Sequence, residues 1–163
     1  MAGNVPIQQE GSPMDALIGR KLVKVVRLAW HWAGEPDDLS VGPVHLVFDD
    51  GRGLFLAGQS DWTLNLVQTD PGDDRWLDPY DYDYDGGRWL PRDASTESPF
   101  ASVSARPLTE LASIRNEVNE VIGLRLDFDG HMLTLKTLQG EVKTYLPEYP
   151  LISESVAAGG GLS

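Results

Sequence analysis

The sequence contains no cysteine among its 163 residues, which excludes a disulfide framework, a thiolate metal site and a cysteine nucleophile. It also contains no run of 18 apolar residues, so no transmembrane helix and no membrane association are predicted. The first fourteen residues have neither a basic region nor an apolar core and do not resemble a secretory signal. These absences together predict a cytoplasmic protein. Residues 1–13 are predicted to form a disordered N-terminal segment.

Basic side chains are scarce. The chain has 13 Lys and Arg against 25 Asp and Glu, a net charge of -12. The sequence therefore predicts that the chain does not bind nucleic acid, because phosphate binding requires basic side chains that displace counterions. The same charge attracts positively charged surfaces and accelerates encounters with them. The expected partner is a basic protein, and the oligomeric state is not predicted.

Sequence motifs of catalysis are also lacking. There is no G-x-S-x-G elbow, no phosphate-binding P-loop and no G-x-G-x-x-G. The three histidines, His31, His45 and His131, do not have the spacing of metal ligands. His45 falls on the polar face of a predicted strand and His131 in a predicted turn, so both are expected at the surface. The sequence therefore predicts a non-enzymatic protein with no cofactor and no metal site.

Two stretches of the chain share one pattern, in which an alternating apolar strand ends in Phe-Asp and is followed by a glycine turn and Leu-x-Leu. The first copy has its strands at residues 44–48 and 54–56, and the second at residues 122–128 and 133–135. Alternation with a period of two is typical of half-buried strands. Asp-Gly supplies the positive φ angles that tight hairpin turns require. An internal duplication of a β-hairpin unit is the interpretation that accounts for both copies.

Further strands flank each hairpin, and roughly eight short strands at regular spacing predict a mainly β fold. We expect two repeated antiparallel meander or hairpin units, packed as a sandwich or a partly open barrel, with little helix. Residues 14–18 can form one helical turn. Residues 108–118 fit a strand by the repeat, but they also have a weak helical stripe, and the sequence leaves this choice open.

The predicted organisation is a single β domain over residues 14–150. It comprises a first repeat (14–69), an acidic connector (70–101) and a second repeat (102–150), followed by a flexible tail (151–163). Within the connector, residues 70–97 hold nine acidic and three basic side chains. The difference between them accounts for half of the net charge of the chain. Residues 75–89 hold five of the fourteen aromatic side chains, interleaved with aspartates.

Three interpretations of this connector compete. In the first it is a protein-binding surface, in which aromatic anchors and aspartates meet a basic partner; the predicted contact residues are Trp76, Asp78, Tyr80, Asp81, Tyr82, Asp83, Tyr84, Asp85 and Trp89. In the second, Asp81-x-Asp83-x-Asp85-Gly86 is half of a calcium loop, although Arg92 stands where the closing glutamate belongs. In the third it is a solvated loop or a strand whose tyrosines cover the core while its aspartates face water.

One other short motif, Ser60-Asp61-Trp62, is distinctive. Asp61 is expected to cap a turn, because aspartate side chains accept hydrogen bonds from nearby backbone amides. Trp62 is expected to fill the core.

Three segments give the chain a resemblance to small acidic bacterial proteins. They are Phe48-Asp-Asp-Gly, Ser60-Asp61-Trp62-x-Leu64 and Gly123-Leu-Arg-Leu-Asp-Phe-Asp-Gly130. Over roughly residues 17 to 146 the chain is similar to the immunity proteins encoded beside polymorphic or contact-dependent toxins. This resemblance implies a cytoplasmic, cysteine-poor protein that blocks a toxin domain by occluding it, and it assigns no individual binding residue. The expected function is therefore that of an immunity protein; the alternative is a β-sandwich module that binds a small ligand, a carbohydrate or calcium.

Overall fold

The computed structural model describes residues 13–37, 41–138 and 141–145 of the chain. The predicted N-terminal segment before Pro13 and the predicted tail lie outside these residues. The helical elements are η1 (Pro13–Leu17), η2 (Arg75–Tyr80) and α1 (Phe100–Val103). The strands are β1 (Leu22–Trp32), β2 (Val44–Phe48), β3 (Gly53–Gly58), β4 (Leu64–Thr69), β5 (Asp83–Tyr84), β6 (Gly87–Asp93), β7 (Glu110–Arg115), β8 (Val121–Phe128), β9 (His131–Leu138) and β10 (Glu141–Tyr145).

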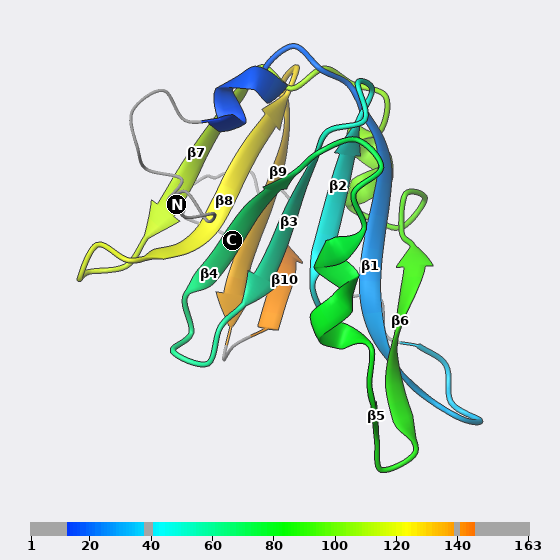
Figure 1. Ribbon diagram of the computed structural model, residues 1–163. Helices are drawn as coiled ribbons and strands as arrows, with labels where there is room; N and C mark the ends of the chain where they lie inside the picture. Colours follow the sequence, from blue (N-terminus) through cyan, green and yellow to red (C-terminus); the bar gives the residue numbers. More distant parts are fainter. Residues whose placement is uncertain (1–12, 38–40, 139–140, 146–163) are drawn as a thin grey trace, which may run out of the picture.

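The prediction of a mainly β fold is confirmed, because the strands form two antiparallel sheets and the helices are short (Figure 1). The first sheet has the strand order β4-β3-β2-β1-β6-β5, and the second has the order β10-β9-β8-β7. Residues 110–115, for which strand and helix were both open, form strand β7. The helical turn expected near residue 14 is the 3-10 helix η1.

Each half of the chain contributes a four-stranded meander, β1 to β4 in the first half and β7 to β10 in the second. Their central hairpins are alike: Leu46 pairs with Leu54 in β2–β3, and Leu126 pairs with Leu133 in β8–β9. The inward side chains of both hairpins are leucines at alternate positions and one phenylalanine, with Val44 added in the first, as the period-two pattern predicts.

The main core lies between the two sheets. Phe48 at the end of β2 stacks on Phe128 at the end of β8, with the ring centroids 6.4 Å apart. Helix α1 adds the buried side chains of Phe100 and Val103 to the same layer. Arg27 of β1 is fully buried there, donates a hydrogen bond to the carbonyl of Val142 in β10, and lies over the Phe100 ring.

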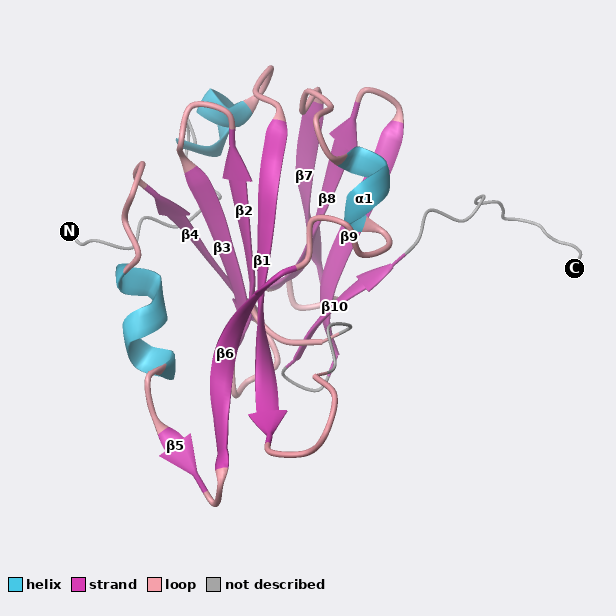
Figure 2. Cartoon of the chain, turned by 90° about the vertical axis from the view of Figure 1, so that its right-hand side faces the viewer, coloured by secondary structure: helices cyan, strands magenta, loops and turns pink. Residues whose placement is uncertain are grey.

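The sheets are also joined through the backbone at two corners. Lys21, just before β1, bridges to Pro107, and Val41, just before β2, bridges to Lys143 of β10. These isolated bridges tie the two sheets together at two points, and the sheets remain separate layers that face each other across the core (Figure 2).

The connector between the meanders is structured and belongs to the first sheet. Its strand β6 pairs with β1 over seven residues, and β5 extends the sheet beyond β6. Its helix η2 lies over the outer face of the first sheet, away from the second sheet (Figure 2). The acidic, aromatic part of the sequence is therefore held in place by the meander that precedes it.

Candidate functional site

Strand β1 changes partner along its length. It pairs with β2 from Leu22 to Arg27 and with β6 from Val26 to Trp32. The second part of β1 (residues 28–32), β6 and β5 therefore form a ribbon that leaves the rest of the sheet; we call it the β1–β6 ribbon. It extends below the two sheets in the view of Figure 1.

The ribbon ends in a hairpin turn at Asp85 and Gly86, whose φ angles are 53° and 86°. Two successive positive φ angles are the geometry of a two-residue type I′ turn, for which Asp-Gly is a preferred sequence. The half calcium loop in the sequence is thus a hairpin turn in the structure. Within the part of the chain that the structure describes, no group of three or more His, Asp or Glu side chains is placed to hold a metal ion.

Aromatic side chains converge on the outer face of the ribbon. Trp30 and Trp89 are cross-strand partners in β1 and β6, with centroids 5.2 Å apart and rings at 82°. Trp30 also contacts Trp32 and Tyr82, with centroids at 5.9 and 6.1 Å. The indole Nε1 of Trp89 donates a 2.9 Å hydrogen bond to the Tyr82 hydroxyl, and the Trp89 ring meets Tyr80 edge-on at 5.8 Å. These five residues form what we call the aromatic cluster.

A glycine allows the cluster to pack closely. Gly87 of β6 is the cross-strand partner of Trp32 and lies against the Trp30 indole. A Cβ atom at this position would lie 2.4 Å from Trp30 Nε1, closer than side-chain atoms approach. Gly87 therefore leaves the room that the Trp30 ring needs to lie against the backbone of β6.

Helix η2 continues the aromatic layer from the ribbon onto β2 and β3. The Trp76 ring lies 4.4 Å from His45 and 4.9 Å from Phe55, and Tyr80 meets Phe55 edge-on at 5.9 Å. Trp76 is therefore a packing residue that attaches η2 to the sheet, while Tyr80 lies between the sheet and the aromatic cluster. Because of this cover, β3 is buried from Gly53 to Ala57 on both of its faces.

The expectation that His45 lies at the surface is wrong. Its side chain is only 8% exposed, beneath Trp76, and its Nε2 makes a 2.9 Å hydrogen bond with Thr69 Oγ1. Burial lowers the pKa of His45 to about 4, so the imidazole is neutral at pH 7. The strand face that seemed polar is covered by a helix that the alternation pattern of β2 does not reveal.

The aspartates of the connector have separate positions. Asp78 and Asp81 are exposed at the end of η2, near Arg88 of β6. Asp83 lies 3.7 Å from Arg88 across the hairpin, in an ion pair exposed to solvent. Asp85 forms the turn. All four carboxylates are accessible on the ribbon and at its junction with η2.

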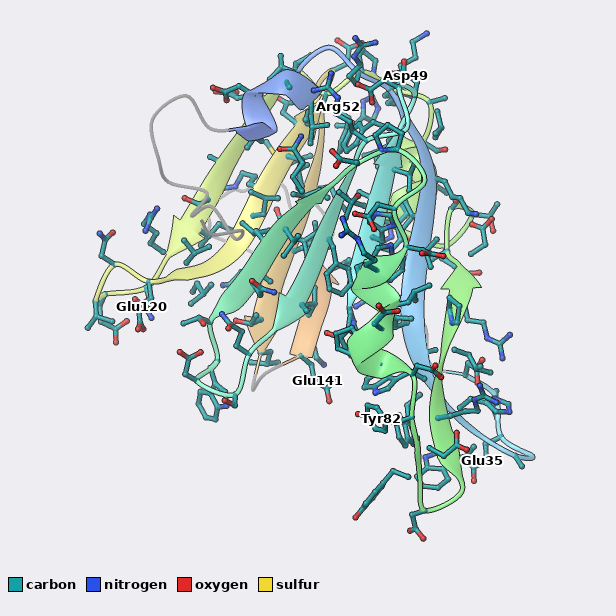
Figure 3. The ribbon with its side chains drawn as sticks, in the orientation of Figure 1. Glu35, Asp49, Arg52, Tyr82, Glu120 and Glu141 are labelled. Atoms are coloured by element: carbon teal, nitrogen blue, oxygen red, sulfur yellow. The ribbon has the colours of Figure 1, made fainter. Side chains whose placement is uncertain are left out.

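The tyrosines of the hairpin are exposed as well. Tyr82 is 50% exposed and Tyr84 is 69% exposed, so neither side chain covers the core. The strand interpretation of the connector, which required both tyrosines to cover the core, does not hold for them. Figure 3 shows Tyr82 on the ribbon, at the lower end of the molecule. The predicted contact residues thus divide into a packing residue (Trp76), partly buried cluster members (Tyr80 and Trp89) and an exposed hairpin.

Two hollows flank the Tyr80–Trp89 pair, each of about 270 Å³. The first, the Glu141 pocket, lies between the ribbon and the end of β10; it is lined by Trp30, Val41, Gly42, Pro43, Gly58, Tyr80, Trp89, Glu141 and Val142. The second, the Asp78 pocket, lies between η2 and β6; its charged lining residues are Asp74, Asp78, Asp81 and Arg88.

Three residues of this region were missed by the sequence analysis: Trp30, Trp32 and Glu141. The alternation Trp30-x-Trp32 places both indoles on one strand face, and this signal was available in the sequence. Glu141 comes near the cluster only through the packing of the second sheet, for which the sequence gives no signal.

The loop between β3 and β4 contains another correction. Asp61 caps its turn as predicted, accepting hydrogen bonds from the Thr63 amide and hydroxyl at 3.1 and 2.6 Å. Trp62, expected in the core, is instead 59% exposed, with a φ angle of 72°. Its carbonyl accepts a 2.8 Å hydrogen bond from Thr137 of β9, so the turn directs the indole outward. His131, by contrast, is exposed as predicted, although it is the first residue of β9 and not part of the preceding turn.

Comparison of the chain with known protein families, with curated proteins and with solved structures finds no match. Over the described residues, none of the helices has the length and apolar character needed to cross a membrane.

Proposed function

We propose that this chain is a non-enzymatic, cytoplasmic protein-binding domain that uses the β1–β6 ribbon and the end of η2 to bind a basic protein. The observation that supports the proposal is the exposure of Tyr82 and Tyr84 beside Asp81, Asp83 and Asp85 on a projecting hairpin. The specific form that the sequence resemblance implies is an immunity protein, which occludes the functional surface of a toxin or effector domain.

The chemistry of the ribbon suits this role. Tyrosine and tryptophan provide large contact areas at low entropic cost, because few rotatable bonds are fixed when they bind. The neighbouring carboxylates accept charge-assisted hydrogen bonds from arginine and lysine. A net charge of -12 steers a basic partner toward the domain and raises the association rate at low ionic strength.

The two histidines near this surface support binding rather than catalysis. His45 is covered by Trp76 and hydrogen-bonded to Thr69, so its ring nitrogen does not reach a bound molecule. His31, on the inner face of the ribbon, is engaged by the carboxylate of Asp37 at 2.8 Å, and Asp37 also accepts a hydrogen bond from Arg92. Both imidazoles thus have structural partners.

The decisive experiment compares two double variants. The partner is isolated by co-purification from the native host, and its affinity is measured for the wild type and for Tyr82→Ala/Asp83→Ala. Loss of a central aromatic anchor is expected to weaken binding by about 2 kcal/mol or more. The matched control is Glu117→Ala/Val118→Ala, which removes an exposed acid and an exposed apolar side chain from the β7–β8 turn. Unchanged affinity for the ribbon variant would show that the surface is assigned wrongly.

A second candidate function is supported by the Glu141 pocket. Indole and phenol walls are platforms on which sugars or other small ligands stack, so a β module that binds a carbohydrate or small ligand is the alternative. Thermal melts with a panel of sugars, and with calcium or a chelator, separate the two: a rise in melting temperature that depends on ligand supports the module. A melt that no small ligand shifts, together with capture of a basic protein, supports the protein-binding domain.

A further inference from the structure

The Glu141 pocket lies where the two halves of the molecule meet. Trp30 and Trp89 approach it from the β1–β6 ribbon, Tyr80 from the end of η2, and Glu141 from the first position of β10. Its floor is tied together by the backbone, because the Gly42 amide donates a hydrogen bond to the Val142 carbonyl at 3.3 Å. The pocket therefore requires both sheets and the connector, and it is not a property of either meander alone.

The aromatic walls of the pocket stand nearly at right angles. The ring planes of Trp30 and Trp89 make an angle of 82°, and those of Trp89 and Tyr80 make an angle of 84°. A flat group placed in such a corner can lie against the face of one ring while its edge meets the next. The negative face of an indole attracts a cation within about 6 Å of its centroid. The walls are thus suited to a planar cation.

The Glu141 pocket and the Asp78 pocket differ in the charges of their lining residues. Among the lining residues of the Glu141 pocket that the structure describes, Glu141 is the only ionisable group besides the Tyr80 phenol, and none is a lysine or an arginine. The Asp78 pocket has three carboxylates, but Arg88 lines it too. A cation that enters the Glu141 pocket meets one carboxylate and, among the described lining residues, no positive charge. At about 270 Å³ it is slightly smaller than sites for drug-sized ligands, which range from about 300 to 1,000 Å³, so it suits a single side chain.

We propose that the Glu141 pocket receives an arginine side chain of the basic partner. The guanidinium stacks in the corner between Trp30 and Trp89 and forms an ion pair with the Glu141 carboxylate, while its methylene groups contact the apolar floor. Arginine fits better than lysine, because its planar guanidinium stacks on aromatic rings and pairs with both oxygens of a carboxylate. The origin of the arginine in a partner protein rests on the proposed function. The preference of the pocket for a guanidinium group rests on the pocket alone.

The test uses the full chain and small probes, without the partner. N-acetyl-arginine amide is titrated while the indole N–H resonances of Trp30 and Trp89 are followed by NMR, with Trp62 as the exposed indole outside the pocket. N-acetyl-citrulline amide, which has nearly the same shape and no charge, is the neutral probe. We expect saturable shifts at Trp30 and Trp89, and binding about fivefold weaker for the citrulline probe because the cation–π and ionic attractions are lost.

Variants assign the charge. Glu141→Gln should weaken binding of the arginine probe about threefold, the effect of one exposed ion pair. Glu120→Gln, in the distant β7–β8 turn, makes the same change in net charge and should have no effect (Figure 3). Equal affinity for the two probes, tighter binding of N-acetyl-lysine amide, or shifts confined to Trp62 would each overturn the proposal. If the probes fail but Tyr82→Ala/Asp83→Ala still weakens partner binding, the pocket is assigned wrongly while the protein-binding function stands.

Discussion

The outer faces of the two sheets differ in what covers them. On the first sheet, Trp76 and Tyr80 of η2 cover His45 and Phe55, so that side chains on both faces are buried. On the second sheet, Glu110 and Arg125 are exposed, and along β8 and β9 exposed or half-exposed side chains alternate with buried leucines. The two meanders thus have different outer faces. The second meander is a half-buried sheet, whereas the first, with the connector folded over it, supports an aromatic surface.

The largest expected effect concerns the layer that both sheets share. Phe48 and Phe128 occupy corresponding positions and are both fully buried. Phe48→Ala and Phe128→Ala should each lower the free energy of unfolding by about 3–5 kcal/mol, through lost burial and the cavity that remains. Urea denaturation measures this. A loss below about 1 kcal/mol for either variant would contradict the equivalence of the two inner faces.

The next effect depends on pH and on the covered outer face alone. The folded pKa of His45 is lowered to about 4 by burial, whereas the unfolded value is near 6.5. Between these values the unfolded state binds the proton, so the stabilisation present above pH 6.5 is lost as the pH falls toward 4, by roughly 3 kcal/mol.

Urea titrations at pH 7 and pH 4.5 measure this effect as a difference between variants. His45→Gln should reduce the pH dependence of stability. His131→Gln, which alters an exposed histidine in the second meander, should retain it. An identical pH profile for the wild type and His45→Gln would show that His45 is not buried in the neutral form.

Truncation on the two outer faces compares their cover directly. Trp76→Ala removes the ring that packs on His45 and Phe55, and we expect a loss of about 2 kcal/mol, less than for a fully buried ring. Arg125→Ala, on the second sheet, should stay within about 0.5 kcal/mol of the wild type. Urea unfolding measures both, and equal losses would remove the distinction between the two faces.

The smallest effect compares two turns of the same kind. Asp129-Gly130 in the second meander and Asp85-Gly86 in the ribbon both have two successive positive φ angles. Gly130→Ala should lower the global free energy of unfolding by about 1 kcal/mol, because alanine is strained at positive φ. Gly86→Ala should leave the global value nearly unchanged and accelerate hydrogen exchange in the ribbon hairpin, since β5 has only two residues. A global loss as large as that of Gly130→Ala would show that the ribbon unfolds together with the sheets.

Local chemistry made much of the fold predictable. Alternating leucines and Asp-Gly turns identified the central hairpins, and the period of two distinguished strands from helices along most of the chain. Asp61 was correctly expected to cap a turn, because the amide and hydroxyl groups that donate to its carboxylate belong to Thr63, two residues away. In these cases the determining interactions are close together in the sequence.

The candidate site was predictable only in part. The concentration of aromatic and acidic residues pointed to the connector, but the pairing of Trp30 with Trp89 brings together strands from distant parts of the chain. Trp62 and His45 were misplaced for the same kind of reason. The exposure of Trp62 depends on Thr137 in the other half of the molecule, and the burial of His45 depends on η2. The alternation of apolar and polar residues in one strand does not indicate whether a segment distant in the sequence covers that strand.

The change of partner along β1 also has a consequence for the order of folding. The hairpins of both meanders close short loops, so they can form early and with little loss of chain entropy. The pairing of β1 with β6 must instead enclose the whole first meander, and the Glu141 pocket needs β10 as well. A ribosome-bound chain from which β10 has not yet emerged can therefore form the first meander but not the pocket, so the pocket is completed only late in synthesis.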